Sequence, residues 1–275
     1  MLKGLSINGY LCVFFISLLS VSSSIAGALV GNKGTKEAGA LLMSTNKPPI
    51  FRGVQPVFTF TAGASISQLG QPQSFMPLDL CRYNYKPQGS MTNMLWGGFI
   101  GSEVKRSSSW GLIVGLGYYQ PTRLSTKGTL TQGADLESDN AYNYRYQTQS
   151  QQLLVEGKLY WIAKERIQPF VMLGIGPAWN KTSHYQTNVP PFLEFTPEFS
   201  SHTQTNFTYA VGSGVDVSLT QAFRVGVGYR FTDVGSANTG SAQIDEIPIS
   251  STLKQRHLYA NQVLVQFTFI PWSRD

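Results

Sequence analysis

Eight segments of the chain alternate, with a period of two, between apolar residues and small or polar residues. In residues 223–231 one face carries Phe, Val, Val, Tyr and Phe, and the other carries Arg, Gly, Gly and Arg. Successive residues of a β-strand point to opposite sides of the sheet, so this period predicts strands with two unlike faces. The other seven predicted strands are residues 56–64, 94–104, 110–119, 153–161, 171–179, 207–219 and 257–269.

The face opposite the apolar one indicates the surroundings of these strands. It is rich in glycine with isolated charges, which makes a poor solvent surface but leaves room inside a narrow barrel. Only 13% of the residues are charged, about half the share in ordinary soluble domains. Aromatic residues near the strand ends suit the girdles of an outer-membrane barrel. We therefore expect the apolar face to meet lipid; the alternative is a soluble, lipocalin-like barrel that binds a ligand inside.

The connections between the predicted strands alternate strictly in length. Three are short and polar: residues 105–109, 163–167 and 220–222. Four are long: residues 65–90, 121–150, 180–206 and 232–256. This alternation predicts short periplasmic turns and long external loops, with both chain ends on the periplasmic side.

The N-terminus predicts export. A lysine precedes an apolar run of about 11 residues and a small-residue cleavage site, which is the pattern of a signal peptide. We expect residues 1–26 to be the signal peptide, 27–54 a periplasmic lead-in, 55–270 the barrel and 271–275 a short tail. Cys12 would leave with the signal, so Cys81 alone cannot form an internal disulfide.

In these features the chain resembles the small OmpA-like or opacity-type outer-membrane barrels. The resemblance rests on the strand number, the loop alternation, and the segments 226–231 (GVGYRF) and 263–269 (VLVQFTF). It implies an eight-stranded antiparallel up-and-down transmembrane β-barrel in the outer membrane of a Gram-negative bacterium. Such barrels usually end in an aromatic residue, whereas here residues 270–275 follow Phe269.

Six charged residues fall on the inward face of the predicted strands. They are three acids and three bases: Glu103, Glu156, Lys158, Asp216, Arg224 and Arg230. Buried charges persist only when they are paired and hydrogen-bonded, so we predict an ion-pair network that plugs the lumen. The alternative is a narrow ion or proton path through the same charges.

The sequence offers little support for catalysis. The best constellation for a lipid-modifying enzyme is Ser201 and His202 with Glu194 and Glu198 in the same predicted loop. An Asp–His protease is less supported, because no Asp lies near a His in the sequence. Walker, Rossmann and zinc motifs are absent from the sequence. We predict no catalytic residue, metal or cofactor.

The predicted long loops are the expected sites of specific contact. Residues 140–147 are rich in tyrosine and amides, a composition that suits adaptable binding surfaces. The recognition candidates are Tyr142, Tyr144, Arg145 and Tyr146; the alternative is that these residues continue the neighbouring strands.

The basic residues predict the kind of partner. Without Lys3, 20 basic residues against 15 acidic ones leave a net charge of +5, and no basic cluster suggests nucleic acid. The expected partners are membrane lipid, lipopolysaccharide phosphates and a host-surface or extracellular ligand. The predicted function is membrane integrity and adhesion or host contact.

Overall fold

The computed structural model describes residues 54–77, 81–107, 109–133, 140–163, 166–189 and 196–271. The predicted signal peptide, residues 27–53 of the lead-in and residues 272–275 of the tail lie outside the described residues. The strands of this part are β1 (Val54–Gln68), β2 (Gln73–Phe75), β3 (Arg82–Pro87), β4 (Ser90–Ser107), β5 (Trp110–Pro121), β6 (Leu124–Gly133), β7 (Asn140–Trp161), β8 (Ile167–Asn188), β9 (Glu198–Phe199), β10 (His202–Ser218), β11 (Phe223–Asp233), β12 (Ala242–Ile244), β13 (Ile247–Ile249) and β14 (Tyr259–Phe269). Within the same residues, no helix is long and apolar enough to cross a bilayer.

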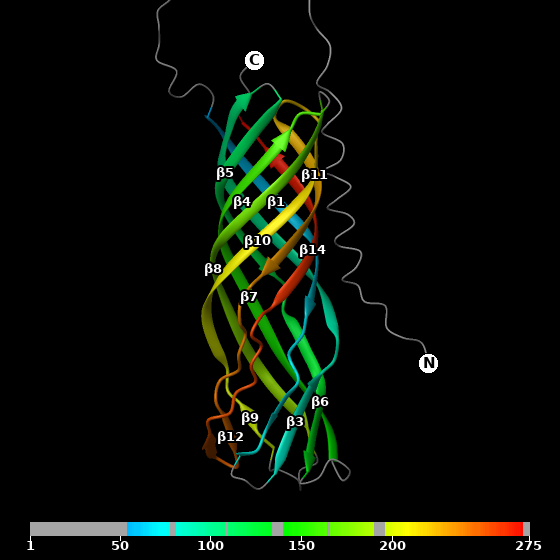
Figure 1. Ribbon diagram of the computed structural model, residues 1–275, viewed down its shortest axis with the longest axis vertical. Helices are drawn as coiled ribbons and strands as arrows, with labels where there is room; N and C mark the ends of the chain where they lie inside the picture. The colour runs from blue at the N-terminus through cyan, green and yellow to red at the C-terminus, as the bar shows by residue number, and fades with distance from the viewer. Residues whose placement is uncertain are drawn as a thin grey trace, which may run out of the picture. The chain divides into compact units, whose positions relative to one another are not determined.

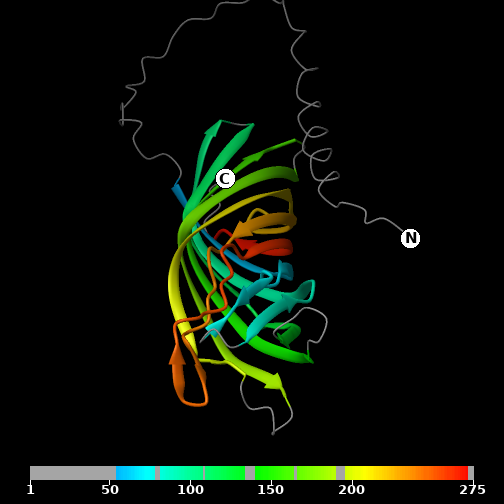
Figure 2. The same cartoon turned by 60° about the horizontal axis from the view of Figure 1, so that its bottom comes forward.

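Eight of these strands pair side by side in a closed ring. The order around the ring is β1, β4, β5, β7, β8, β10, β11 and β14, and β14 pairs again with β1 (Figures 1 and 2). Every pairing in the ring is antiparallel. The predicted all-β, antiparallel class is therefore confirmed. Closure satisfies the backbone donors and acceptors of both edges of the sheet.

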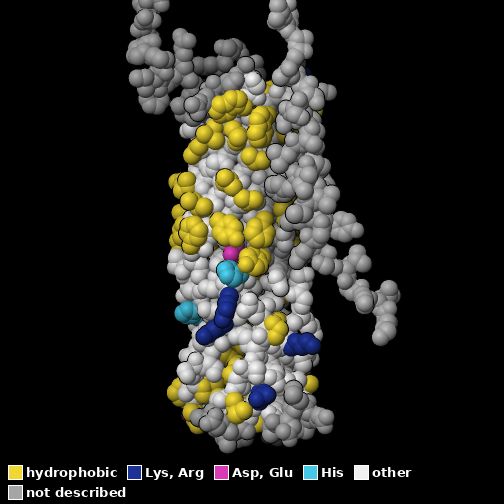
Figure 3. Space-filling model, in the orientation of Figure 1, with side chains coloured by type: hydrophobic (Ala, Val, Ile, Leu, Met, Phe, Trp, Pro, Cys, Tyr) yellow, Lys and Arg dark blue, Asp and Glu magenta, His cyan; other side chains and the backbone are white. Residues whose placement is uncertain are grey.

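The apolar face of the ring strands points outward. We call the exposed large apolar side chains of these strands the apolar belt. Every ring strand contributes at least one member; examples are Phe60, Ile100, Leu116, Val155, Leu173, Phe207, Val227 and Val263. In Figure 3 the belt covers the upper half of the visible face, and fewer apolar side chains lie below it. The predicted division of the strands into an apolar outward face and an opposite inward face is confirmed.

Glycine on the inward face lets bulky side chains lie flat against the wall. A Cβ on Gly97 would come 2.3 Å from the Tyr119 ring, and one on Gly111 would come 2.3 Å from the Tyr160 hydroxyl. Both tyrosines are almost completely buried. The space beside these glycines is therefore filled by an aromatic ring from a neighbouring position of the sheet.

Strands occupy much of the predicted long connections. Residues 121–150 contain β6 and the first half of β7, which pair from Leu124↔Thr148 to Gln132↔Asn140. Residues 65–90 contain β2 and β3, and residues 180–206 contain the end of β8, β9 and the beginning of β10. The physical reason is the Thr- and Tyr-rich composition, which favours strands even where no apolar face alternates.

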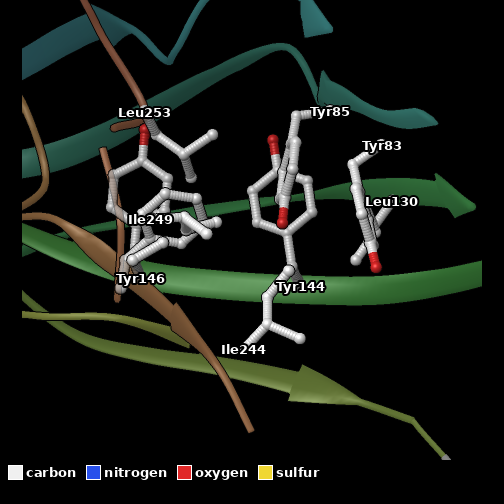
Figure 4. Close-up of a cluster of buried hydrophobic side chains, with 10 residues drawn as sticks. Tyr83, Tyr85, Leu130, Tyr144, Tyr146, Ile244, Ile249 and Leu253 are labelled. Carbon is white, nitrogen blue, oxygen red and sulfur yellow. The ribbon is translucent and has the colours of Figure 1, made fainter. Parts of the chain in front are cut away.

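These elements form a second structured region beyond the belt, which we call the extension. It comprises β2, β3, β6, β9, β12 and β13 with the adjoining ends of β7 and β8. Its core gathers buried aromatic and aliphatic side chains, most of which Figure 4 labels: Tyr83, Tyr85, Leu130, Tyr144, Tyr146, Phe199, Ala242, Ile244, Ile249 and Leu253. The extension therefore has its own hydrophobic core.

Candidate functional site

The six predicted inward charges form three ion pairs inside the ring. Lys158 Nζ lies 2.7 Å from Asp216 Oδ2, and Arg224 Nη2 lies 2.8 Å from Glu103 Oε2. The third pair is looser, with 3.7 Å between Arg230 Nη1 and Glu156 Oε1. The partners come from β4, β7, β10 and β11, so the pairs span the lumen between strands distant in sequence.

Uncharged side chains add hydrogen bonds to these ion pairs. The Tyr119 hydroxyl donates to Glu156 Oε2 at 2.9 Å, and the Tyr160 hydroxyl donates to Glu103. Gln262 Oε1 accepts from Arg230 Nε at 2.6 Å, and Gln266 Oε1 accepts from Lys158 Nζ at 2.9 Å. Sequence reasoning placed the two tyrosines and Gln262 and Gln266 opposite the apolar face but did not name them as partners. The position of these four residues on the inward face, shared with the charged residues, is the sequence signal that indicates them as partners.

Aromatic rings shield two of the cations. The Arg230 guanidinium lies 3.7 Å from the centre of the Tyr119 ring, and Lys158 Nζ lies 3.7 Å from the centre of the Phe170 ring. Such cation–π contacts strengthen when the site is desolvated. The lumen charges are thus held by oxygen ligands and aromatic faces together.

Apolar layers lie among the charges. One cluster contains Phe99, Ile113, Tyr160 and Met172, and another contains Leu95, Leu154 and Leu264. A cavity of about 20 Å³ lies among side chains that include Tyr119, Glu156 and Lys158, enough for about one water molecule. This packing is typical of a small barrel whose interior is filled by side chains.

The four recognition candidates have different environments. Tyr144 and Tyr146 are buried in the core of the extension, stacked on each other with ring centres 6.3 Å apart. Tyr142 is half-buried and Arg145 is exposed. All four lie on β7, so they continue a ring strand, which was the alternative interpretation. Of the four, Arg145 offers the most accessible polar group.

Arg145 lines a cleft of about 850 Å³ together with residues from the middle of β6, the beginning of β7 and the end of β8. Its Nε donates to Gln186 Oε1 at 2.7 Å, and Lys127 lies directly opposite Arg145 in the β6–β7 register. The polar lining also includes Asn143, Asn188 and Glu198. Side-chain amides and two cations in one cleft can hydrogen-bond a polar or anionic ligand.

The tyrosines around the extension core resist ionisation. Burial raises the pKa of Tyr83 to about 12, and the nearby Cys81 adds to the rise. Burial also raises the pKa values of Tyr85 and Tyr144, and it raises that of Tyr185 well above the usual value. These hydroxyls stay neutral at physiological pH.

The histidines give no hydrolytic triad among the described residues. Ser201 and His202 are exposed with no hydrogen bond between them in the described part, and Glu194 lies outside it. Ser183 Oγ lies 3.0 Å from His184 Nδ1, so a different Ser–His pair is in contact. No group of three or more potential metal ligands occurs in the same residues.

One Asp–His pair does form, although no Asp is close to a His in the sequence. Asp233 Oδ2 lies 2.9 Å from His257 Nδ1, across a sequence separation of 24 residues. The pairing arises because the segments that follow β11 and precede β14 run side by side, with Val234 N donating to Leu258 O at 3.0 Å. The separation of Asp233 and His257 in the sequence gives no indication of this pair.

The comparison with known proteins identifies the class. The family model of the outer membrane protein beta-barrel domain matches residues 60–254, and the chain belongs to this family. It is accordingly an outer-membrane β-barrel protein. No curated protein sequence matches the chain.

Several solved structures are similar at low identity. Neisserial surface protein A is 11% identical over 78% of this chain and 96% of its own, with a TM-score of 0.38. OprG from Pseudomonas aeruginosa is 12% identical over 79% and 98%, with a TM-score of 0.45. The outer membrane protease OmpT from Escherichia coli is 9% identical over 79% and 96%, with a TM-score of 0.42.

Proposed function

We propose that the protein is a non-enzymatic, eight-stranded transmembrane barrel with a plugged lumen that supports membrane integrity and surface contact. In this proposal residues 1–26 are the signal peptide, 27–54 the periplasmic lead-in, 55–270 the barrel and 271–275 the tail. The apolar belt faces lipid, and the extension lies outside the cell.

The observation that carries the plugged lumen is the set of three buried ion pairs among apolar layers. The side chains of Glu103 and Arg230 have no exposed surface, and the side chain of Lys158, which has the most exposed surface of the six, is 13% exposed. An open aqueous pore requires many more than eight strands. The small number of strands and the filled interior therefore favour a structural role for the barrel over a channel function.

Conductance tests this proposal. The full chain, refolded in detergent and inserted into a planar lipid bilayer, should give a quiet baseline under an applied voltage. A large porin inserted under the same conditions provides the control for recording. Stable, large single-channel steps from the purified protein would overturn the plugged lumen.

For surface contact, the cleft beside Arg145 is the site we propose. Lys127 and Arg145 are both exposed, and like charges directly opposite each other in a sheet repel, so an anion between them relieves the repulsion. Asn143 and Asn188 add amide groups that suit the hydroxyls of a saccharide. The proposed partner is an anionic polymer or glycan on a host or neighbouring surface.

A further inference from the structure

Residues 250–258 form an ordered segment beyond the apolar belt although they contain no regular strand. Ala237 and Gln255 exchange both backbone hydrogen bonds, and Thr239 N donates to Leu253 O at 3.0 Å. The side chain of Gln73 makes two hydrogen bonds to the backbone of Lys254. Its Nε2 donates to the Lys254 carbonyl at 2.7 Å, and its Oε1 accepts from Lys254 N at 2.8 Å. The backbone of this segment is therefore fixed on both sides.

Side chains of this segment fall on two sides. Leu253, Gln255 and Leu258 are buried, whereas Lys254, Arg256 and His257 are exposed. We call these three exposed residues the basic ridge. Figure 3 shows Lys or Arg and His side chains gathered directly below the belt.

The ridge adjoins the edge of the belt through a row of aromatic contacts. The His257 ring stacks on Tyr259 with centres 5.3 Å apart, Tyr259 on Phe231 at 5.7 Å, and Phe231 lies 6.4 Å from Tyr209. Aromatic girdles mark the boundary between hydrocarbon and headgroups in outer-membrane barrels. A cation directly beyond such a row lies at the depth of lipid headgroups.

The charge of the ridge is largely uncompensated within the described residues. Asp233 pairs with His257 and is itself 5% exposed, and it also accepts a hydrogen bond from Gly235 N at 2.9 Å. No salt bridge in the described part of the chain engages Lys254 or Arg256. Two cations and an oriented imidazole are thus presented toward the headgroup layer.

We propose that Lys254, Arg256 and His257 bind the phosphate groups of a phosphorylated glycolipid in the outer leaflet. Arginine gives paired hydrogen bonds to phosphate oxygens and lysine adds a point charge. Neighbouring cations suit a headgroup with more than one phosphate better than a zwitterionic phospholipid, whose amine they would repel. The inference depends on the part of the proposed function in which the belt faces lipid and the extension lies outside.

Thermal stabilisation by added lipid tests the site. The full chain in non-ionic detergent is heated with diphosphorylated lipid A, with dephosphorylated lipid A or with phosphatidylethanolamine, and the folded fraction is read from gel mobility. Diphosphorylated lipid A should raise the unfolding midpoint most, because a ligand that binds only the folded state stabilises it. K254Q/R256Q should remove about half or more of that rise.

The matched control is R82Q/K86Q, which removes two exposed cations from β3 and should keep the full rise. An equal rise with dephosphorylated lipid A or phosphatidylethanolamine, or a full rise in K254Q/R256Q, would overturn the proposed site. The heat-dependent mobility of the protein without added lipid reports barrel formation separately. Its absence would count against the proposed function itself.

Discussion

At the scale of single residues, the lumen shows why a buried charge depends on its partner. Glu103 receives hydrogen bonds from Arg224 and Tyr160, so both of its oxygens are satisfied. Removing one member of such a pair leaves the other charge buried without compensation, which costs more than removing both. The stability of the ring therefore depends on the complete pair.

This argument predicts that Glu103→Ala lowers the free energy of unfolding by about 3–5 kcal/mol. The measurement is urea unfolding in detergent micelles, followed by tryptophan fluorescence. The matched control is E103L/R224M, which removes both charges and keeps apolar volume, and it should be distinctly less destabilised than the single variant. A single variant as stable as the unaltered protein would show that the pair contributes little.

At the scale of elements, the tyrosine core of the extension makes stability depend on alkaline pH. Tyrosine in an unfolded chain loses its proton near pH 10, whereas Tyr83 in the folded protein keeps it to about pH 12. Between these values the folded state binds more protons than the unfolded state, so stability falls as pH rises. Well below pH 10 the Tyr83 hydroxyl is protonated in both the folded and the unfolded state, so its contribution to stability does not vary with pH.

We therefore expect the thermal midpoint of the extension to fall progressively between about pH 10 and about pH 12, measured by near-UV circular dichroism. Tyr83→Phe removes one ionisable hydroxyl from the edge of the core and should make the decline shallower. A midpoint with the same pH slope in both proteins would contradict a role for Tyr83.

The elements also show where sequence reasoning succeeds. Strands 94–104, 153–161 and 223–231 and their faces follow from an alternation that is local to each strand. The partner of each lumen charge is not local, because it depends on how the strands are staggered around the ring. The first half of β7 falls in a predicted long connection, with strand continuation as the alternative, because its apolar groups are tyrosines among amides. Those tyrosines are buried because residues of β3, β6, β9, β12 and β13, which are distant in sequence, form one cluster with them.

At the scale of the whole molecule, one sheet reverses the polarity of its two faces between the lumen and the extension. Around the lumen the outward face is apolar and the inward face carries paired charges. In the extension the inward face is aromatic and the outward face carries polar groups, including Lys127 and Arg145. The inversion of polarity along one sheet supports the division into a part within the membrane and a contact part outside it.

This division predicts that attachment can be removed without unfolding the barrel. K127S/R145S, displayed on whole cells as the full chain, should reduce attachment to a sulfated or sialylated glycan surface at least several-fold, because both cations of the cleft are lost. Heat-dependent gel mobility should stay unchanged, since both side chains are exposed. The control R123S/K181S removes two exposed cations outside the cleft lining and should attach normally. Equal loss in both variants would indicate a general effect of surface charge, and normal attachment of K127S/R145S would exclude the cleft as the contact site.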